Sequence, residues 1–143
     1  MAVRTMATRV FVLALASALC ACSEAPRRFP EPSAGTYSVV TLQATISGVS
    51  EILQAARVSP EFFRSAQVRP LLGRFIVDSD RRAGARLVVV LGYDLWQRRF
   101  HASPQVVGTM IQLNGASATI IGIAKPGFNF PHGTLLWVPK QAS

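Results

Sequence analysis

Short stretches of alternating hydrophobic and polar residues predict β-strands along most of the chain. Residues 37–46 alternate and are rich in Val and Thr, which favours a strand, and Gly48 to Ser50 interrupt it. Residues 52–58 fit either a second strand or a helical turn. Further strands are expected at residues 75–77, 110–113, 117–123 and 135–138.

The centre of the predicted domain is a continuous apolar run followed by an amphipathic helix. Leu87 to Leu91 are all apolar, which is typical of a buried central strand. Gly92 breaks the run, and residues 93–100 are expected to form a helix, in which side chains three and four positions apart share a face. One face of this helix carries its aromatic residues, Tyr93, Trp96 and Phe100.

A shorter helix is predicted to begin at residues 59–61, whose sequence is Ser-Pro-Glu. Ser is a common N-cap, Pro suits the first helical position, and Glu favours the positive end of a helix. Phe62, Phe63 and Ala66 fall on one side of this helix, and Pro70 ends it.

Turn residues complete the expected domain. Asn114-Gly115 predicts a tight hairpin, because both positions of such a turn need a positive φ. Pro126-Gly127 suits a type II turn. We therefore expect one α+β domain over residues 36–143, with a mostly antiparallel sheet, two short helices on one face and no internal repeat.

The N-terminus has the layout of an export signal, predicted over residues 1–21. Arg4 and Arg9 are basic, and the apolar run that follows is shorter than the ~20 residues that span a bilayer. The sequence Leu-Cys-Ala-Cys resembles a bacterial lipobox, which implies that Cys22 becomes a lipid-modified mature N-terminus. An ordinary signal peptide and an uncleaved anchor remain alternatives. The expected location is the cell envelope or periplasm, as a membrane-anchored lipoprotein.

Residues 22–35 are rich in Pro and small polar residues and predict a tether between the membrane and the domain. Both cysteines, Cys20 and Cys22, precede the domain, so the domain has no disulfide and depends on its hydrophobic core.

The formal net charge of +8 indicates a basic surface. Such a surface suits nucleic acid, anionic lipid, acidic polymers or an acidic protein partner, and export excludes nucleic acid. Alternatively, the arginines reflect only the composition of a GC-rich genome.

Candidate catalytic and metal-binding residues are sparse. Asp78 and Asp80 are two carboxylates where a metal site needs three or more ligands, and His101 and His132 lie far apart in the sequence. There is no G-x-S-x-G nucleophile motif and no G-x-x-x-x-G-K-[ST] phosphate loop. The sequence predicts no catalytic residue, cofactor or metal, and no enzyme.

A protein interaction surface is the remaining hypothesis for a site. Arg pairs with acidic groups in a bidentate manner and is enriched at interfaces, although a solvated helix face is the plainer interpretation. Phe128 and Phe130 are either exposed anchors or tucked under the sheet edge. The arginines proposed for the surface are Arg64, Arg69, Arg74, Arg98 and Arg99.

Five motifs in order carry a family resemblance: V-S-P-E-F-F-R, L-V-V-V-L-G-Y-D-L-W-Q-R-R-F, V-V-G-T-M-I-Q-L-N-G, T-I-I-G-I-A-K-P-G-F and L-W-V-P. The set resembles the periplasmic core domain of MacB-type ABC-transporter permeases, especially the acidobacterial branch. The resemblance favours a strand at residues 52–58. It implies a partial core domain that acts without catalysis, as an interaction or force-transmitting module in an export or efflux assembly. Its expected partner is an ABC permease or adaptor subunit.

Two other hypotheses remain. The chain is a non-functional fragment of a longer permease, or it is a stand-alone envelope protein that binds anionic lipid or polymer through its arginines. An uncovered sheet edge also predicts self-association.

Overall fold

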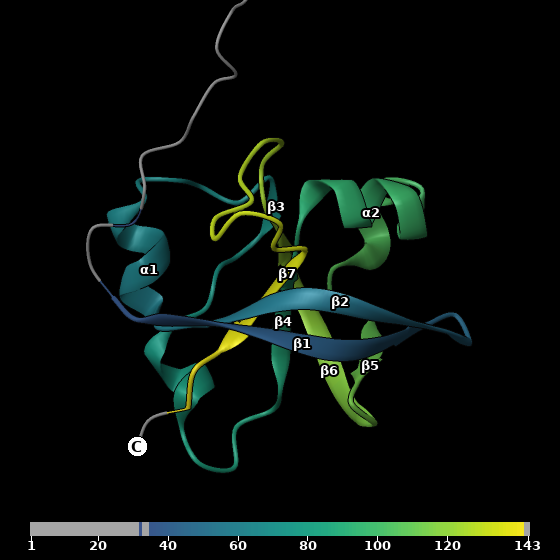
Figure 1. Cartoon of the computed structure of the whole chain (residues 1–143), viewed down its shortest axis with the longest axis horizontal. Coiled ribbons are helices and arrows are strands. Elements are labelled where there is room, and N and C mark those ends of the chain that lie inside the picture. Colours follow the sequence, from purple (N-terminus) through teal and green to yellow (C-terminus); the bar gives the residue numbers. More distant parts are fainter. Residues whose placement is uncertain (1–31, 33–34, 142–143) are drawn as a thin grey trace, which may run out of the picture.

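The computed structural model describes Pro32 and residues 35–141 (Figure 1), and the predicted signal and almost all of the tether lie outside them. The strands are β1 (Tyr37–Ile46), β2 (Val49–Val58), β3 (Leu72–Gly73), β4 (Val88–Leu91), β5 (Met110–Leu113), β6 (Ala116–Ile123) and β7 (Leu136–Pro139). The helices are α1 (Pro60–Ser65), α2 (Tyr93–Phe100) and two short 3₁₀ helices, η3 (Asp78–Arg81) and η4 (Pro104–Val106).

The sheet is mixed and closes on itself. Its strand order is β3-β6-β4-β7-β2-β1-β5, and a further pairing between β5 and β6 joins its two sides into a barrel. The pairs β2–β7 and β4–β6 are parallel, and the others in the described part of the chain are antiparallel. The expected α+β class is confirmed, and the sheet, predicted to be mostly antiparallel, is a mixed sheet of barrel form.

The two helices lie on opposite faces of the central strands, so their prediction on one face was wrong. Val89 and Leu91 of β4 pack in the same cluster as Leu95 of α2. Val88 and Val90 pack in a second cluster, with the aromatic residues of α1. Figure 1 shows α1 and α2 on either side of the sheet. The error has a physical cause, because an all-apolar strand lacks the alternation that assigns its faces.

Aromatic rings fill the core on the α1 side. Phe63 of α1 stacks on Phe75 with ring centroids 4.1 Å apart, and Phe128 lies 5.4 Å from Trp137 of β7. The indole Nε1 of Trp137 donates to the carbonyl oxygen of Phe130 at 3.0 Å. This cluster explains why residues 75–77 do not form the predicted strand: Phe75 turns into the core beyond the short strand β3.

Both tight hairpins have the backbone that their residues favour. Asn114 and Gly115 have φ values of 50° and 83°, which confirms the predicted turn. Ser47 and Gly48 have φ values of 52° and 81° and join β1 to β2, so residues 52–58 belong to a strand. Ser59 precedes α1 as expected, but its Oγ accepts from the backbone N–H of Thr36 at 2.9 Å.

Two glycines allow β3 and β6 to approach closely. Gly73 pairs with Gly122 in the antiparallel register of these strands. A Cβ on Gly122 would lie 2.2 Å from the carbonyl oxygen of Arg74, and a Cβ on Gly73 would lie 2.0 Å from that of Ile121. Side chains are therefore excluded at both positions by the backbone of the neighbouring strand.

The substitution Gly122→Ala is expected to lower the free energy of unfolding by about 3 kcal/mol, because the methyl group displaces backbone that cannot move aside cheaply. Gly48→Ala is the matched control, since Gly48 has open space around it and a positive φ. Its cost is about 1 kcal/mol of backbone strain. Urea unfolding followed by circular dichroism measures both, and equal losses would contradict the close approach of β3 and β6.

Charged contacts tie α2 to the β1–β2 hairpin. Arg98 donates to Glu51 of β2 at 2.8 Å, and Arg99 donates to the other carboxylate oxygen. Arg99 also donates to the carbonyl oxygen of Ile46 at 3.1 Å. The hydrogen bond from Arg98 is the main cause that lowers the pKa of Glu51 below its usual 4.5, and Arg99 adds to it. Glu51 therefore stabilises the fold in its ionised form.

The substitution Glu51→Gln is expected to destabilise the fold by up to about 1 kcal/mol at pH 7. A lowered folded-state pKa gives stability that is present above 4.5 and is lost as the pH falls through the folded value. The difference between the wild type and this variant should therefore shrink from pH 7 to pH 3 in urea unfolding. Asp78→Asn, at an exposed carboxylate without a salt bridge among the described residues, is the control. A pH-independent difference would contradict the ionic role.

Candidate functional site

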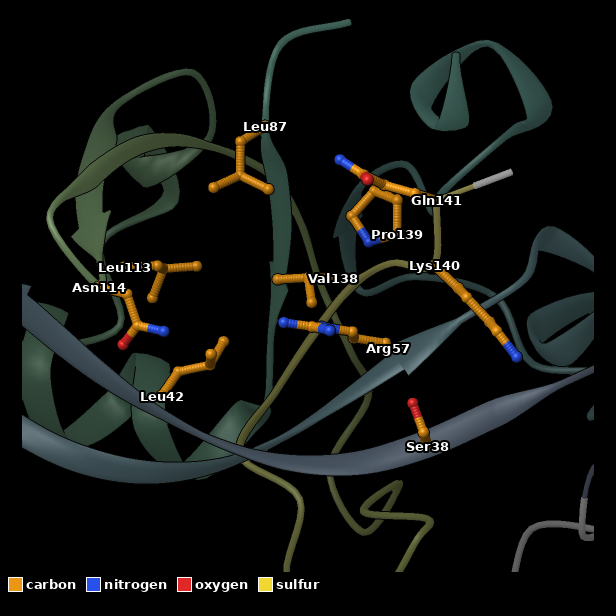
Figure 2. Close-up of a pocket in the computed structure, with 10 residues that line it drawn as sticks. All are labelled: Ser38, Leu42, Arg57, Leu87, Leu113, Asn114, Val138, Pro139, Lys140 and Gln141. Atoms are coloured by element: carbon orange, nitrogen blue, oxygen red, sulfur yellow. The ribbon is translucent and has the colours of Figure 1, made fainter. Parts of the chain in front are cut away.

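A groove of about 450 Å³ opens at one end of the barrel, where β1 separates from β5. β1 pairs with β5 only at Ala44 and Thr45, although β1 extends back to Tyr37. Within the part of the chain that the structure describes, the first half of β1 therefore has no strand paired on its β5 side. The residues that line the groove are Ser38, Leu42, Arg57, Leu87, Leu113, Asn114, Val138, Pro139, Lys140 and Gln141 (Figure 2).

The groove has an apolar wall and cationic side chains. Leu42, Leu87, Leu113 and Val138 supply the apolar surface and belong to or pack against the α2-side core. In Figure 2 the guanidinium of Arg57 points toward the leucines, while the amine of Lys140 points away from them. The lining residues include no carboxylate.

Arg57 lies at a position of β2 where the alternation of side chains along the strand would place a core residue. Leu53 and Ala55 of β2 face the α2-side core, and Arg57 continues their side of the strand. The register pairs Arg57 with Ser38 of β1 and with Val138 of β7. The inner face of the barrel thus changes from apolar to polar at this end.

The cationic character extends beyond the groove. Arg81 donates its Nε–H to the carbonyl oxygen of Lys140 at 2.7 Å, which brings the end of η3 against the rim of the groove. Neither Arg57 nor Lys140 forms a salt bridge with a carboxylate among the described residues. The groove therefore offers positive charge that the rest of the domain leaves uncompensated.

The five arginines of the predicted surface do not form one surface. Arg98 and Arg99 lie on α2 and hold Glu51, whereas Arg64 lies on α1, on the opposite side of the sheet, and contacts Glu61 at 3.1 Å. Arg74 contacts Asp80 at 2.8 Å. Arg69 is exposed and has no salt bridge in the described part of the chain.

The predicted acidic cluster is a structural pair. Asp80 accepts from Arg74 and, at 2.9 Å, from the backbone N–H of Val77. Partial burial acts to raise the pKa of Asp80, but these hydrogen bonds outweigh it and the pKa lies below its ordinary value. The same contact raises the pKa of Arg74. Asp78 is exposed and does not join the pair.

The two phenylalanines of the predicted surface are not exposed anchors. Phe128 is only 3% exposed, in the aromatic core. Phe130 is half-buried, stacked on Phe62 at 6.1 Å and edge-on to Tyr37 at 5.4 Å. Both therefore support the interpretation that this turn tucks under the sheet.

The histidines occupy turns. His101 ends α2 with a φ of 53°, and the carbonyl oxygen of His132 accepts from Gln54 at 2.7 Å. Within residues 35–141, no three His, Cys, Asp or Glu residues gather in a way that could hold a metal ion. No helix of these residues has the length and apolar character to cross a membrane. Cys22 lies outside the described residues, so its lipidation stays a prediction.

The groove residues Arg57 and Lys140 were missed by the sequence analysis, which predicted an interaction surface from other arginines. A signal was present for Arg57: a charged residue interrupts the inward alternation of a strand. Lys140 gave no comparable signal, because it lies beyond the end of β7.

Solved structures share this fold. The extracellular domain of the noncanonic ABC-type transporter YknZ from Gram-positive bacteria matches with a TM-score of 0.60 at 16% identity, covering 73% of this chain and 52% of that one. The periplasmic region of MacB from Actinobacillus actinomycetemcomitans matches with a TM-score of 0.58 at 18% identity, covering 73% and 45%. The chain spans about half the length of these structures. No curated protein sequence matches it.

The sequence itself matches a known family over residues 10–143, which covers all of the described strands and helices. The family is described as the MacB-like periplasmic core domain, as the motifs predicted, while the acidobacterial branch stays a prediction. Since this match spans far more than half of the sequence, the chain belongs to the family of MacB-like periplasmic core domains.

Proposed function

We propose that this chain is a non-catalytic, extracytoplasmic module that contacts the subunits of an ABC-type export or efflux assembly. The observation that carries the proposal is the family match over residues 10–143. The similar solved structures are parts of an ABC-type transporter and of MacB. The partner is an ABC permease or its adaptor, bound through a protein–protein surface.

The structure supports an interaction role through its distribution of charge. Three of the acidic residues, Glu51, Glu61 and Asp80, form salt bridges within the domain. Arg57, Arg69 and other cations have no such partner among the described residues, so the outer surface retains positive charge for a partner. The transmission of force through the barrel is a further part of the proposal.

Site-specific photo-crosslinking in the source bacterium tests the proposal. A photoreactive residue replaces Thr41, Arg69 or Gln97, one at a time, because these exposed residues sample β1, the α1 side and α2. At least one variant is expected to yield a crosslinked product in which mass spectrometry identifies an ABC permease or adaptor subunit. Products that contain only lipid or lipopolysaccharide would instead support a stand-alone envelope protein. Exported chain without any product would overturn the proposal.

The proposed lipid anchor on Cys22 has its own test. Cys22→Ser should move the protein from the membrane fraction to the soluble fraction and remove the mass of the lipid from the mature chain, because the acyl chains supply most of the membrane affinity. Cys20→Ser is the matched control and should leave both unchanged. Membrane association that survives Cys22→Ser would indicate an uncleaved anchor, and a soluble, unlipidated wild type would indicate an ordinary signal peptide.

A further inference from the structure

The first half of β1 presents backbone groups on one side that pair with no strand of the described residues. Ser59 donates its N–H to the carbonyl oxygen of Thr36 at 2.9 Å, which sets the alternation of hydrogen bonds between β1 and β2. In an antiparallel pair, every second residue bonds to its neighbour and the others point outward. Tyr37, Val39 and Thr41 therefore direct their N–H and C=O groups away from β2.

Further along β1, the backbone groups on the same edge are hydrogen-bonded to Asn114 and β5. Gln43 donates its N–H to Oδ1 of Asn114 at 2.9 Å and accepts from the N–H of Asn114 at 2.8 Å. Pairing with β5 follows at Ala44 and Thr45. The stretch of β1 that does not pair with β5 thus ends at Gln43, next to the groove. A longer β5 would be needed to pair with this stretch.

The sequence of β1 carries none of the residues that usually protect an edge against an added strand. Edge strands commonly carry Lys, Pro or inward-pointing charges that prevent pairing. Residues 37–46 include no charged residue and no proline. Tyr37 is 44% exposed and Val39 is 52% exposed. The edge is therefore both hydrogen-bonding and moderately apolar.

A strand added here would place alternate side chains in the groove. Its inward residues would lie beside Ser38 and Leu42, which line the groove from β1. Ser38 lies opposite Arg57 in the strand register, and the guanidinium of Arg57 points from there toward the leucines, whereas the amine of Lys140 points away from them. Cationic side chains without a carboxylate in the groove lining select for acidic residues, and the leucines select for apolar residues.

We propose that the edge of β1 at Tyr37–Thr41 and the adjoining groove bind an extended, acidic peptide segment of a partner protein as an added β-strand. Backbone hydrogen bonds to Val39 and Thr41 supply the pairing, and Arg57 and Lys140 select for inward carboxylates. This mode of binding is β-augmentation. The inference rests on the proposed interaction role and assigns to it a surface and a chemical class of partner.

A fluorescein-labelled peptide with the sequence Thr-Glu-Thr-Glu-Thr-Val-Thr-Val, together with its reversed sequence, tests the proposal against the purified full chain. The two sequences cover both strand directions. Saturable binding of at least one is expected by fluorescence anisotropy. Replacing the two Glu residues by Lys, or N-methylating alternate amides of the peptide, should weaken binding at least about tenfold, because each change removes either the charge pairing or the backbone donors.

Protein variants locate the binding surface. Val39→Pro removes an outward N–H, which edge strands tolerate, and should weaken binding at least about tenfold, while Val39→Thr retains the N–H and should not. Arg57→Gln and Lys140→Gln should each weaken binding several-fold, whereas Arg69→Gln, away from the groove lining, should not. Thermal unfolding by circular dichroism verifies that Val39→Pro still folds, and the N-methylated peptide provides the same test without altering the protein.

Several outcomes would overturn the proposal. These are no binding of either peptide, equal binding of the Glu and Lys peptides, or binding that N-methylation leaves unchanged. Binding of phosphatidylglycerol vesicles or inorganic phosphate that fully displaces the peptide, without dependence on Val39→Pro, would indicate an anion site. Dimerisation in sedimentation experiments that Val39→Pro abolishes would assign the edge to a second copy. If these tests fail while photo-crosslinks to a permease persist, the proposed function stands and uses another surface.

Discussion

The burial of β4 on both of its faces is the constraint on which the rest of the domain depends. All four of its residues are buried, and its neighbours β6 and β7 are largely buried too. A strand without a solvent face needs a cover on each side. The aromatic residues around α1 cover one side, and α2 with the closed part of the barrel covers the other. Two hydrophobic cores therefore share one set of strands.

Closure of the barrel is complete at one end only. Where β5 pairs with both β1 and β6, the interior is filled by small or aliphatic side chains such as Ala44 and Ala118. Toward Ser38, the same interior face carries Arg57 and opens into the groove. Polar residues are tolerated there because solvent reaches them, and a charged residue in the closed half would lose its hydration. The groove and the positive charge in its lining thus both lie where the pairing between β1 and β5 ends.

Local signals predicted local structure well. The helix at residues 93–100 has the bounds that its aromatic spacing and the preceding glycine indicated, and the Asn114-Gly115 turn forms as expected. The placement of the helices on the sheet was not available from the sequence, because the all-apolar strand before α2 does not distinguish its two faces. The parallel pairing of β2 with β7 joins segments about 80 residues apart, and no local pattern specifies such a partner.

The candidate site was predictable only in part. Arginines were expected to form a contact surface, but Arg98 and Arg99 turn out to hold α2 to Glu51, because the hairpin that carries Glu51 folds back against that helix. Arg57 could be recognised only by its position in the alternation of β2. That it forms no salt bridge among the described residues depends on where their carboxylates lie in space.

The strand register also brings the start of β1 and the end of β7 together. Tyr37 and Pro139 both lie beside Val58, so β1 begins and β7 ends at the same end of the barrel. Tension applied through these two points would load the hydrogen bonds between β1 and β2 one after another rather than all together, because the bonds of this antiparallel pair lie perpendicular to the strands. This end of the barrel is therefore the end at which a pulling force would begin to separate the strands.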